Sequence, residues 1–278
     1  MSLSLDAPTL DKMWPHAAPE LRAGMVSTSE AVFEKYAIVE LADLVDFMAQ
    51  VSEESGGGIA TVEDLNYSAE RLCQVWPKRF PSLEIAAPFA SNPRALANSV
   101  YGGRNGNVAG SNDGWAFRGR GLIQLTGREL YGEIAKATGL DLIAHPAIIN
   151  SPLHALECAA AYWQMRGISA LAAAGNFKQE TRRINGGYTN MAARRAWQAK
   201  WHNALTLTED MHPSGFLVGS KGWAQSQLLA AGCDPQGVDG FWGDDSRAAL
   251  HSFEIAKGLP VDGGDLSPAT IDALKLVA

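Results

Sequence analysis

Two glutamates flank a run of glycines near the end of a predicted helix. Glu54 closes the helix, and Glu63 follows nine residues later, beyond Gly56, Gly57 and Gly58. Hydrolysis of a glycosidic bond needs one protonated carboxyl group, which donates to the leaving oxygen, and one ionised group, which activates water or attacks directly. Consecutive glycines let a chain fold back on itself, so the two acids could face one cleft. Spacing alone favours ordinary surface acids, which are common.

Two further stretches carry polar side chains next to glycines. In residues 118–128, Gln124 and Thr126 would lie on the same side of an extended strand, where an amide and a hydroxyl could bind a sugar and hold a water. The alternative is a polar turn with a short strand. In residues 183–188, Asn185 precedes two glycines, and a turn former and a ligand-binding residue are equally good interpretations.

The charge and cysteine content of the chain argue against several functional classes. The formal net charge is −7, whereas nucleic-acid binding proteins usually carry a basic surplus. Three scattered cysteines do not make a disulfide framework, and the six histidines show no metal-ligand spacing. We therefore expect no nucleic-acid partner, no metal and no other cofactor.

One basic cluster stands out in this otherwise acidic chain. Its members are Arg182, Arg183, Arg194, Arg195 and Lys200. We interpret it as a solvated helix face, because runs of charge usually face solvent. The alternative is a patch that faces an anionic polymer such as a cell wall.

The spacing of apolar residues predicts the elements that position these side chains. Intervals of three and four residues predict a helix over 38–52, which ends at the glycine run. Ser68 is expected to cap a short helix that runs to Trp76. Residues 91–120, rich in Gly, Asn and Arg, are predicted to form a long functional loop. Further helical patterns cover 128–138, 152–166 and 191–205, and strand signals are few.

A change in composition near residues 212–215 predicts two domains, 1–212 and 213–278. In the second domain, the sequence GVDG at 237–240 recurs 23 residues later as PVDG at 260–263. Each copy follows a helix-like run, and a third helix is expected after a serine–proline start signal. The second domain is therefore predicted to hold three short helices.

The chain has no apolar run of about 18 residues, so we expect no membrane insertion. The N-terminal residues, MSLSLDAPTLDKMW, lack the basic and apolar regions of a secretory signal peptide. We therefore expect that export of the protein needs help.

The acidic and glycine-rich stretches resemble the signatures of one enzyme family. Residues 49–57, AQVSEESGG, resemble the segment AQ-x-S-H-E-[ST]-x-G-G of family 19 glycoside hydrolases. GRGLIQLT at 119–126 and INGG at 184–187 resemble the family's other two signatures, in the same order. EDLNYSA at 63–69 and YGGRNGN at 101–107 resemble the compact phage and bacterial members, which act largely as lysozymes of peptidoglycan. The plant members are chitinases.

This resemblance covers roughly residues 10–207 and implies a mainly α, two-lobed, lysozyme-like catalytic domain. Glu54 matches the general acid and Glu63 the general base. Thr126 matches a residue that helps to hold the attacking water, and Gln124 and Asn185 match substrate-binding positions. Three more side chains from the stretches above complete the candidate substrate-binding residues: Tyr101, Arg120 and Arg194.

One position departs from the family pattern. The family often has a histidine before the general acid, where this chain has Glu53. The sequence therefore presents two adjacent acids, and the choice of Glu54 rests on its alignment to the glycines.

The C-terminal segment has a resemblance of its own. Residues 232–274 resemble the peptidoglycan-binding domain 1 family, a three-helix module that binds cell walls. Phe253 is expected in the core of this module rather than at a ligand. Residues 264–266, Gly-Asp-Leu, replace the usual x-x-G after the second VDG, which alters the expected turn but not the fold.

The two resemblances together imply an inverting N-acetylmuramidase, an endolysin that acts on peptidoglycan without a cofactor. We expect a monomer that stays in the host cytoplasm until a holin releases it to the wall in the periplasm. The alternatives are a chitinase, a lysozyme effector delivered into rival bacteria, and a non-catalytic wall-binding protein.

Overall fold

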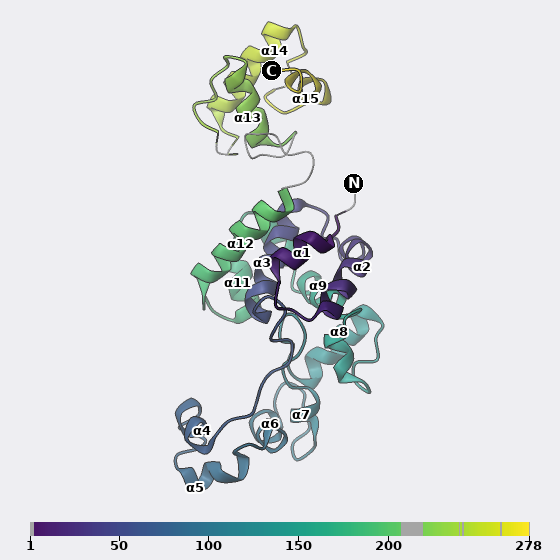
Figure 1. Ribbon diagram of the computed structural model, residues 1–278, viewed down its shortest axis with the longest axis vertical. Helices are drawn as coiled ribbons and strands as arrows, with labels where there is room; N and C mark the ends of the chain where they lie inside the picture. Colours follow the sequence, from purple (N-terminus) through teal and green to yellow (C-terminus); the bar gives the residue numbers. More distant parts are fainter. Residues whose placement is uncertain (1–2, 207–218, 239, 241, 262, 278) are drawn as a thin grey trace. The chain divides into compact units, whose positions relative to one another are not determined.

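The computed structural model describes residues 3–206, 219–238, 240, 242–261 and 263–277. The chain divides into two compact units, Met1–His202 and Asn203–Ala278 (Figure 1). The predicted domain boundary near 212–215 lies outside the described residues. Over the described ranges, β structure is limited to two isolated antiparallel bridges. None of the helices in these ranges has the length and apolar character of a membrane span.

The first unit has a larger and a smaller helical lobe. The larger lobe holds α1 (Ala7–Met13), α2 (Pro19–Lys35), α3 (Leu41–Ser55), α8 (Arg128–Thr138), the 3-10 helix η2 (Pro146–Asn150), α9 (Ala155–Met165), α10 (Ser169–Ala173), α11 (Phe177–Asn185) and α12 (Met191–Thr206). The smaller lobe holds α4 (Ala69–Val75), α5 (Leu83–Ala86), the 3-10 helix η1 (Ala87–Phe89), α6 (Pro93–Tyr101) and α7 (Asp113–Ala116), which are grouped together in Figure 1. The predicted mainly α, two-lobed architecture is confirmed.

Helix α3 forms the centre of the larger lobe. Every residue from Asp43 to Ser52 is buried, as expected of a helix surrounded by others. The helix starts three residues later than predicted and extends to Ser55, so Glu54 lies in its last turn. The hydroxyl oxygen of Ser52 accepts hydrogen bonds from the indole nitrogens of Trp14 and Trp201, at 2.9 and 2.7 Å. The end of α3 is therefore tied to both α12 and the segment after α1.

The glycine run after α3 takes a backbone conformation that other residues rarely adopt. The φ angles of Gly56, Gly57 and Gly58 are +58°, +68° and +81°. A Cβ atom at Gly58 would lie 2.7 Å from the ring of Trp14 and 2.9 Å from the Cβ of Ala17. Left-handed backbone and close packing thus both require glycine here, and the chain turns away from α3 toward Glu63.

The smaller lobe has its own hydrophobic cluster, made of Leu65, Leu72, Phe80, Ala86, Leu96, Ala97 and Val100. Ser68 caps α4 as predicted, because its hydroxyl accepts a hydrogen bond from the backbone of Arg71. The prediction of a loop over 91–120 is wrong, since α6 and α7 lie within it. Asn92 caps α6 and Pro93 takes its first position. This start signal is recognisable in sequence, but the glycines and asparagines that follow it obscure the helix.

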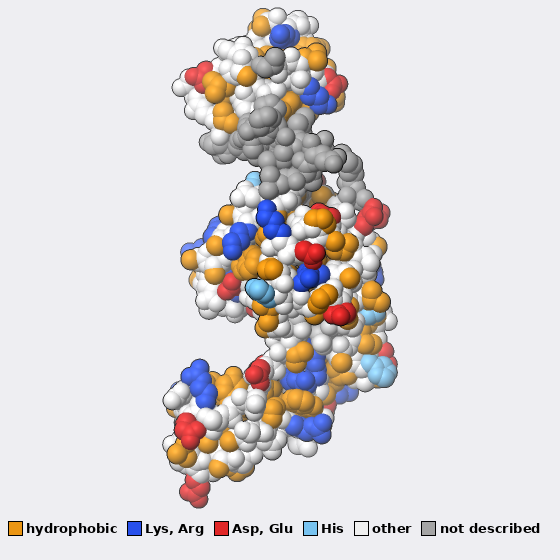
Figure 2. All heavy atoms as spheres, viewed as in Figure 1, with side chains coloured by type: hydrophobic (Ala, Val, Ile, Leu, Met, Phe, Trp, Pro, Cys, Tyr) orange, Lys and Arg blue, Asp and Glu red, His pale blue; other side chains and the backbone are white. Residues whose placement is uncertain are grey.

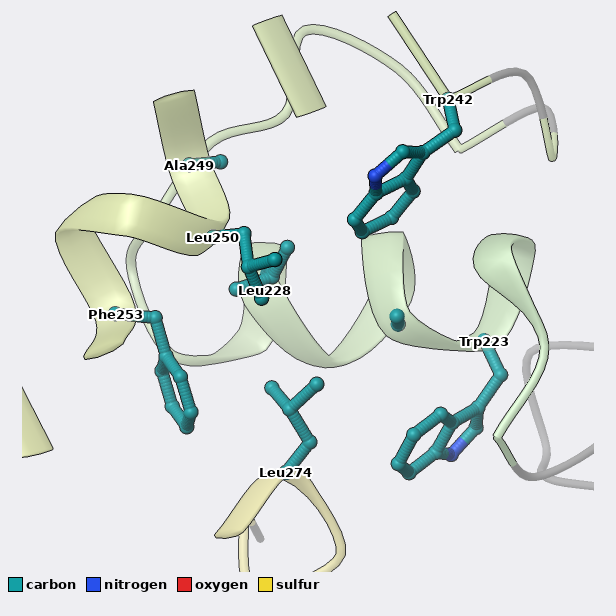
Figure 3. Packing of buried hydrophobic residues seen from close by; sticks show 8 residues of the cluster. Trp223, Leu228, Trp242, Ala249, Leu250, Phe253 and Leu274 are labelled. Atoms are coloured by element: carbon teal, nitrogen blue, oxygen red, sulfur yellow. The ribbon is translucent and has the colours of Figure 1, made fainter. Parts of the chain in front are cut away.

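The second unit is a small helical module with α13 (Lys221–Ala230), α14 (Asp244–Lys257) and α15 (Pro268–Leu274) in the described residues. Figure 3 shows its core, in which Trp223, Leu228, Trp242, Ala249, Leu250, Phe253 and Leu274 point toward one another. Phe253 is 1% exposed, which confirms its predicted place in the core. The carbonyl of Gly264 accepts a hydrogen bond from the Trp242 indole at 2.8 Å, so the unusual second turn still joins the core.

Candidate active site

Glu54, in the last turn of α3, meets a buried arginine. Arg194 Nη2, from α12, lies 2.6 Å from Glu54 Oε1, and the arginine side chain is only 2% exposed. The guanidinium also donates to Gln50 Oε1 at 2.8 Å and to the carbonyl of Thr189 at 3.1 Å. Because the guanidinium is a rigid planar fork, these three acceptors fix the place of the Glu54 carboxyl group. Arg194 engages Oε1, so Oε2 is the oxygen that can carry a catalytic proton.

The predicted basic cluster is not uniform in its surroundings. Arg182, Arg183, Arg195 and Lys200 are exposed, as a solvated helix face requires. The same interpretation is wrong for Arg194, which is buried against Glu54. A buried charge without a partner is strongly destabilising, and Arg194 is met by three acceptors, of which Glu54 is one. Arg194 therefore contacts Glu54 rather than solvent, and its predicted part in the site stays a prediction.

Gln50 belongs to the same group of side chains, although it is not among the site residues predicted from the sequence. It precedes Glu54 by four residues, so both side chains lie on one face of α3. Its amide oxygen accepts from Arg194, and its amide nitrogen donates to Thr181 Oγ1 of α11 at 3.0 Å. The spacing of four residues from the acid is the signal that could have found it.

The two adjacent acids of α3 have different partners. Glu53 Oε1 accepts a hydrogen bond from the side-chain amide of Asn190 at 2.9 Å. Glu54 instead faces the buried guanidinium of Arg194. Asn185 ends α11, four residues beyond Thr181, and its side chain is exposed. The structure thus leaves Asn185 accessible to a ligand, and its binding role stays a prediction.

Backbone pairing holds Glu63 against the segment around Gly119. The amide of Glu63 donates to the carbonyl of Gly119 at 2.9 Å, and the amide of Gly121 donates to the carbonyl of Thr61 at 2.8 Å. Val62 and Arg120 form an isolated bridge between these two bonds. The chain that leaves the glycine turn is therefore anchored directly beside the second acid.

Two donors engage the carboxylate of Glu63. The Tyr101 hydroxyl, at the end of α6, donates to Oε1 at 2.5 Å, and the Gly119 amide donates to Oε2 at 3.2 Å. An ionised carboxylate only accepts hydrogen bonds, so this arrangement suits a base. Burial, and then the bond to Glu63, raise the pKa of Tyr101, so the phenol stays a donor at ordinary pH. Tyr101, which is predicted to bind substrate, contacts Glu63 in the structure.

Residues 120–125 form a tight hairpin. The sequence allows either an extended strand or a polar turn here. Arg120 and Leu125 pair across it, and Gln124 has a φ of +52°. The polar turn is therefore the correct alternative. Gln124 Nε2 donates to the carbonyl of Ala60 at 2.8 Å, and the hydroxyl of Thr126 donates to the carbonyl of Gln124 at 3.1 Å. Left-handed residues other than glycine are costly and cluster at functional sites.

Gly119 has no side chain, which leaves room for the side chains of Glu63 and Gln124 on either side of it. A Cβ atom there would lie 2.9 Å from Gln124 Oε1 and 3.3 Å from Glu63 Oε2. Arg120, the next residue, is 7% exposed and donates to the hydroxyl of Tyr131 at 3.2 Å. Its predicted contact with substrate is not supported, because its guanidinium is buried and bonded to Tyr131 and to the carbonyl of Ala116. In the described part of the chain, no three His, Cys, Asp or Glu side chains are grouped as metal ligands.

A comparison with known proteins identifies the family of the chain. A protein of Haemophilus influenzae, described as glycosyl hydrolase family 19 domain-containing, is 35% identical to this chain over 211 residues, which are 76% of this chain and 100% of the relative. The chain belongs to glycoside hydrolase family 19. The family 19 chain is therefore a glycoside hydrolase. Glu54 and Glu63 occupy the positions that its motifs match to a general acid and a general base.

Other relatives of this family 19 enzyme agree in fold or in part of the sequence. Endochitinase CH25 of Brassica napus is 30% identical over 122 residues, 44% of this chain and 32% of the relative. Chitinase C from Streptomyces griseus HUT6037 has a TM-score of 0.51 at 17% identity, over 72% of this chain and 92% of that chain, which shows a shared fold. Residues 222–274 match the model of a peptidoglycan binding domain, PG_binding_1. The resemblance of the C-terminal segment to this family is thereby confirmed.

Proposed function

We propose that this enzyme hydrolyses the β-1,4 bond between N-acetylmuramic acid and N-acetylglucosamine in bacterial peptidoglycan. The observation that carries the proposal is the union, in one chain, of a family 19 hydrolase and a segment that matches a peptidoglycan binding family. A binding module keeps its hydrolase at a high effective concentration on the polymer that it recognises. Peptidoglycan is therefore the glycan that this combination of units favours.

In the proposed mechanism, Glu54 donates a proton to the glycosidic oxygen through Oε2, while Arg194, itself held by Gln50, orients the carboxyl group. Glu63, held by Tyr101 and the Gly119 amide, takes a proton from water. Each carboxylate oxygen keeps a further lone pair for that proton. The Thr126 hydroxyl donates a hydrogen bond to the carbonyl of Gln124. Its oxygen can therefore accept a hydrogen bond from the attacking water.

We further propose that the reaction inverts the anomeric carbon. The two acids have separate supports, because Glu54 belongs to α3 whereas Glu63 follows the glycine turn and is fixed to the smaller lobe through Tyr101. Inverting glycosidases keep their carboxyl groups roughly 6.5–9.5 Å apart so that a water fits between them. Proton NMR of fresh product should show the α-anomer first, and a β-anomer before mutarotation would recast Glu63 as a nucleophile.

The test of the substrate is the digestion of purified peptidoglycan. Mass spectrometry of the released muropeptides should show new reducing ends on N-acetylmuramic acid. Reducing ends on N-acetylglucosamine would assign the other β-1,4 bond of the strand. Soluble products that form only from chitin would overturn the proposal.

A chitinase is the second candidate, because the relatives include the plant protein named endochitinase CH25 and the fold is shared with chitinase C. Both reactions use the same acid and base and differ in the side groups of the sugar. Parallel rates on colloidal chitin and on purified peptidoglycan separate the two. We expect peptidoglycan to be cut faster.

We propose an endolysin as the biological role, with a holin as the partner that gives the monomeric enzyme access to the wall from the host cytoplasm. A lysozyme effector used against rival bacteria would have the same chemistry. Expression alone in a bacterial cytoplasm should leave cells intact, and co-expression with a holin should lyse them. Lysis without the holin would count against this role.

A further inference from the structure

The smaller lobe contains an open pocket of about 630 Å³ that the acid and base do not line. Val75, Trp76, Pro77, Lys78, Arg79 and Arg104 form its walls. Its lining thus combines one large aromatic ring with three cations and includes no acidic side chain. In the view of Figure 2, basic, acidic and hydrophobic side chains all appear on this lobe.

The positive charge of the pocket is unusual for this protein. The whole chain has a formal net charge of −7, whereas residues 63–118 contain six Lys and Arg against five Asp and Glu. Lys78 and Arg104 are exposed and free to meet a ligand from solvent. Arg79 is half-buried and donates to the carbonyl and hydroxyl of Ser99, so it also holds α6 in place. An anionic group is the ligand that such a lining favours.

The pocket shares its wall with the support of the proposed base. The amide of Arg104 donates to the carbonyl of Tyr101 at 3.2 Å, and the Tyr101 hydroxyl donates to Glu63. On the other wall, Trp76 meets the ring of Tyr67 edge-on, with centroids 5.4 Å apart. Trp76 is half-buried and offers the rest of its ring as an apolar surface. The pocket is therefore connected to Glu63 through two hydrogen bonds, one from Arg104 to Tyr101 and one from Tyr101 to Glu63.

We propose that this pocket binds a carboxylate carried by the glycan, and so favours peptidoglycan over chitin. The inference rests on the proposed function and names the part of the substrate that is recognised. Chitin is uncharged, whereas peptidoglycan carries carboxylates on its stem peptides and, once these are removed, on its lactyl groups. Lys78 and Arg104 supply the charge, and Trp76 supplies a face for an apolar part of the same substituent.

The experiment compares the full chain with a Lys78→Ala/Arg104→Gln double variant. Arg79 is left intact because it supports α6. The matched control is Lys12→Ala/Lys136→Ala, which removes two exposed charges outside the pocket lining. Three soluble tetrasaccharides serve as substrates: one with stem peptides, one with free lactyl groups, and chitotetraose. A substrate that is not cleaved is measured as a competitive inhibitor of one that is.

We expect the double variant to lose about three- to tenfold in kcat/KM, or in inhibition constant, for a carboxylate-bearing fragment, in line with two exposed charge pairs. Chitotetraose should be unaffected, and the control should behave as the parent. A loss confined to the peptide-bearing fragment identifies the stem peptide as the source, and a loss with free lactyl groups identifies the lactyl carboxylate. Equal loss on chitotetraose, or no loss on either anionic fragment, overturns the proposal. Failure of the parent enzyme to cleave any muramyl fragment would instead refute the proposed function, with the inhibition constants still testing the pocket.

Discussion

At the scale of single residues, the surroundings of Glu53 and Glu54 explain why adjacent acids can differ in role. Glu53 is paired with an amide of Asn190, a neutral partner. Glu54 contacts the buried guanidinium of Arg194, which is itself held by Gln50. A group with a fixed position is what general acid catalysis requires, because the proton must reach one particular oxygen.

Glu54→Gln should therefore lower turnover on peptidoglycan by about 10²–10⁴-fold, the usual contribution of a general acid or base. The amide oxygen can still accept from Arg194, so the fold should persist in circular dichroism. Glu53→Gln is the matched control and should keep most of the activity. Activity lost in the control and kept in Glu54→Gln would exchange the roles of the two acids.

Gly119 offers a second test at this scale. A methyl group there would crowd Gln124 Oε1 and Glu63 Oε2, at 2.9 and 3.3 Å. Gly119→Ala should reduce kcat by roughly tenfold or more, because misplacement of a reacting group by even about 1 Å can cost some 10²-fold. Gly132→Ala is the control, since its nearest atom would be 3.9 Å away on Ile143. Equal rates for the two variants would show that Glu63 need not be held in this position.

At the scale of elements, α3 and α11 bury a pair of acids beneath the site. Glu180 of α11 is 0% exposed and Asp46 of α3 is 5% exposed. Burial, and then the charge of Asp46, raise the pKa of Glu180 to about 9. Burial also raises the pKa of Asp46, whose carboxylate accepts from the side chain of Gln198 on α12. The Glu180 carboxyl group is therefore neutral around pH 7.

This pair should make stability depend on pH. The folded-state pKa of Glu180 lies above its unfolded value, so the folded state binds more protons between the two values. The resulting stability is complete below the unfolded pKa, near 4.5, and is lost as pH rises through about 9. Glu180→Gln should flatten the fall in melting temperature between pH 5 and pH 9, with a gain of about 2 °C or more at pH 8. A variant with the same slope as the parent would place the titration elsewhere.

At the scale of the whole molecule, the two units have separate cores and separate resemblances. The core of α13–α15 draws on its own helices, and its segment alone matches the peptidoglycan binding family. Glu54 and Glu63, the proposed acid and base, and the residues that hold them all lie in the first unit. Cleavage and wall binding should therefore be separable by truncation.

A fragment of residues 1–212 should cleave soluble muropeptides at close to the parent rate but sediment less with purified walls. The expected loss is in binding to the insoluble polymer, because only there does a second site raise the effective concentration. Co-sedimentation and soluble turnover measured on the same samples check both parts. Wall binding equal to that of the full chain would remove the proposed role of the second unit.

Local signals in the sequence determined the chain reversal after α3, the cap of α4 and the core place of Phe253. Each depends on a residue's own backbone preference or on helical spacing, so no distant contact is needed. The acids, Thr126, Gln124 and Asn185 came from motif resemblance, and their roles stay predictions. Helix α6 is not predicted from the sequence because the glycines and asparagines at 102–107, which follow it, outweigh its proline start signal.

Only the tertiary structure decided how those residues are held. Arg194 follows Glu54 by 140 residues, and Tyr101 follows Glu63 by 38, so no local pattern predicts that each pair shares a hydrogen bond. The left-handed turn at Gln124 is set by pairing of Arg120 with Leu125 rather than by alternation along a strand. Arg194 is buried, whereas the other members of its basic cluster are exposed. The charge of a buried arginine needs a partner, and the partner of Arg194 comes from another element.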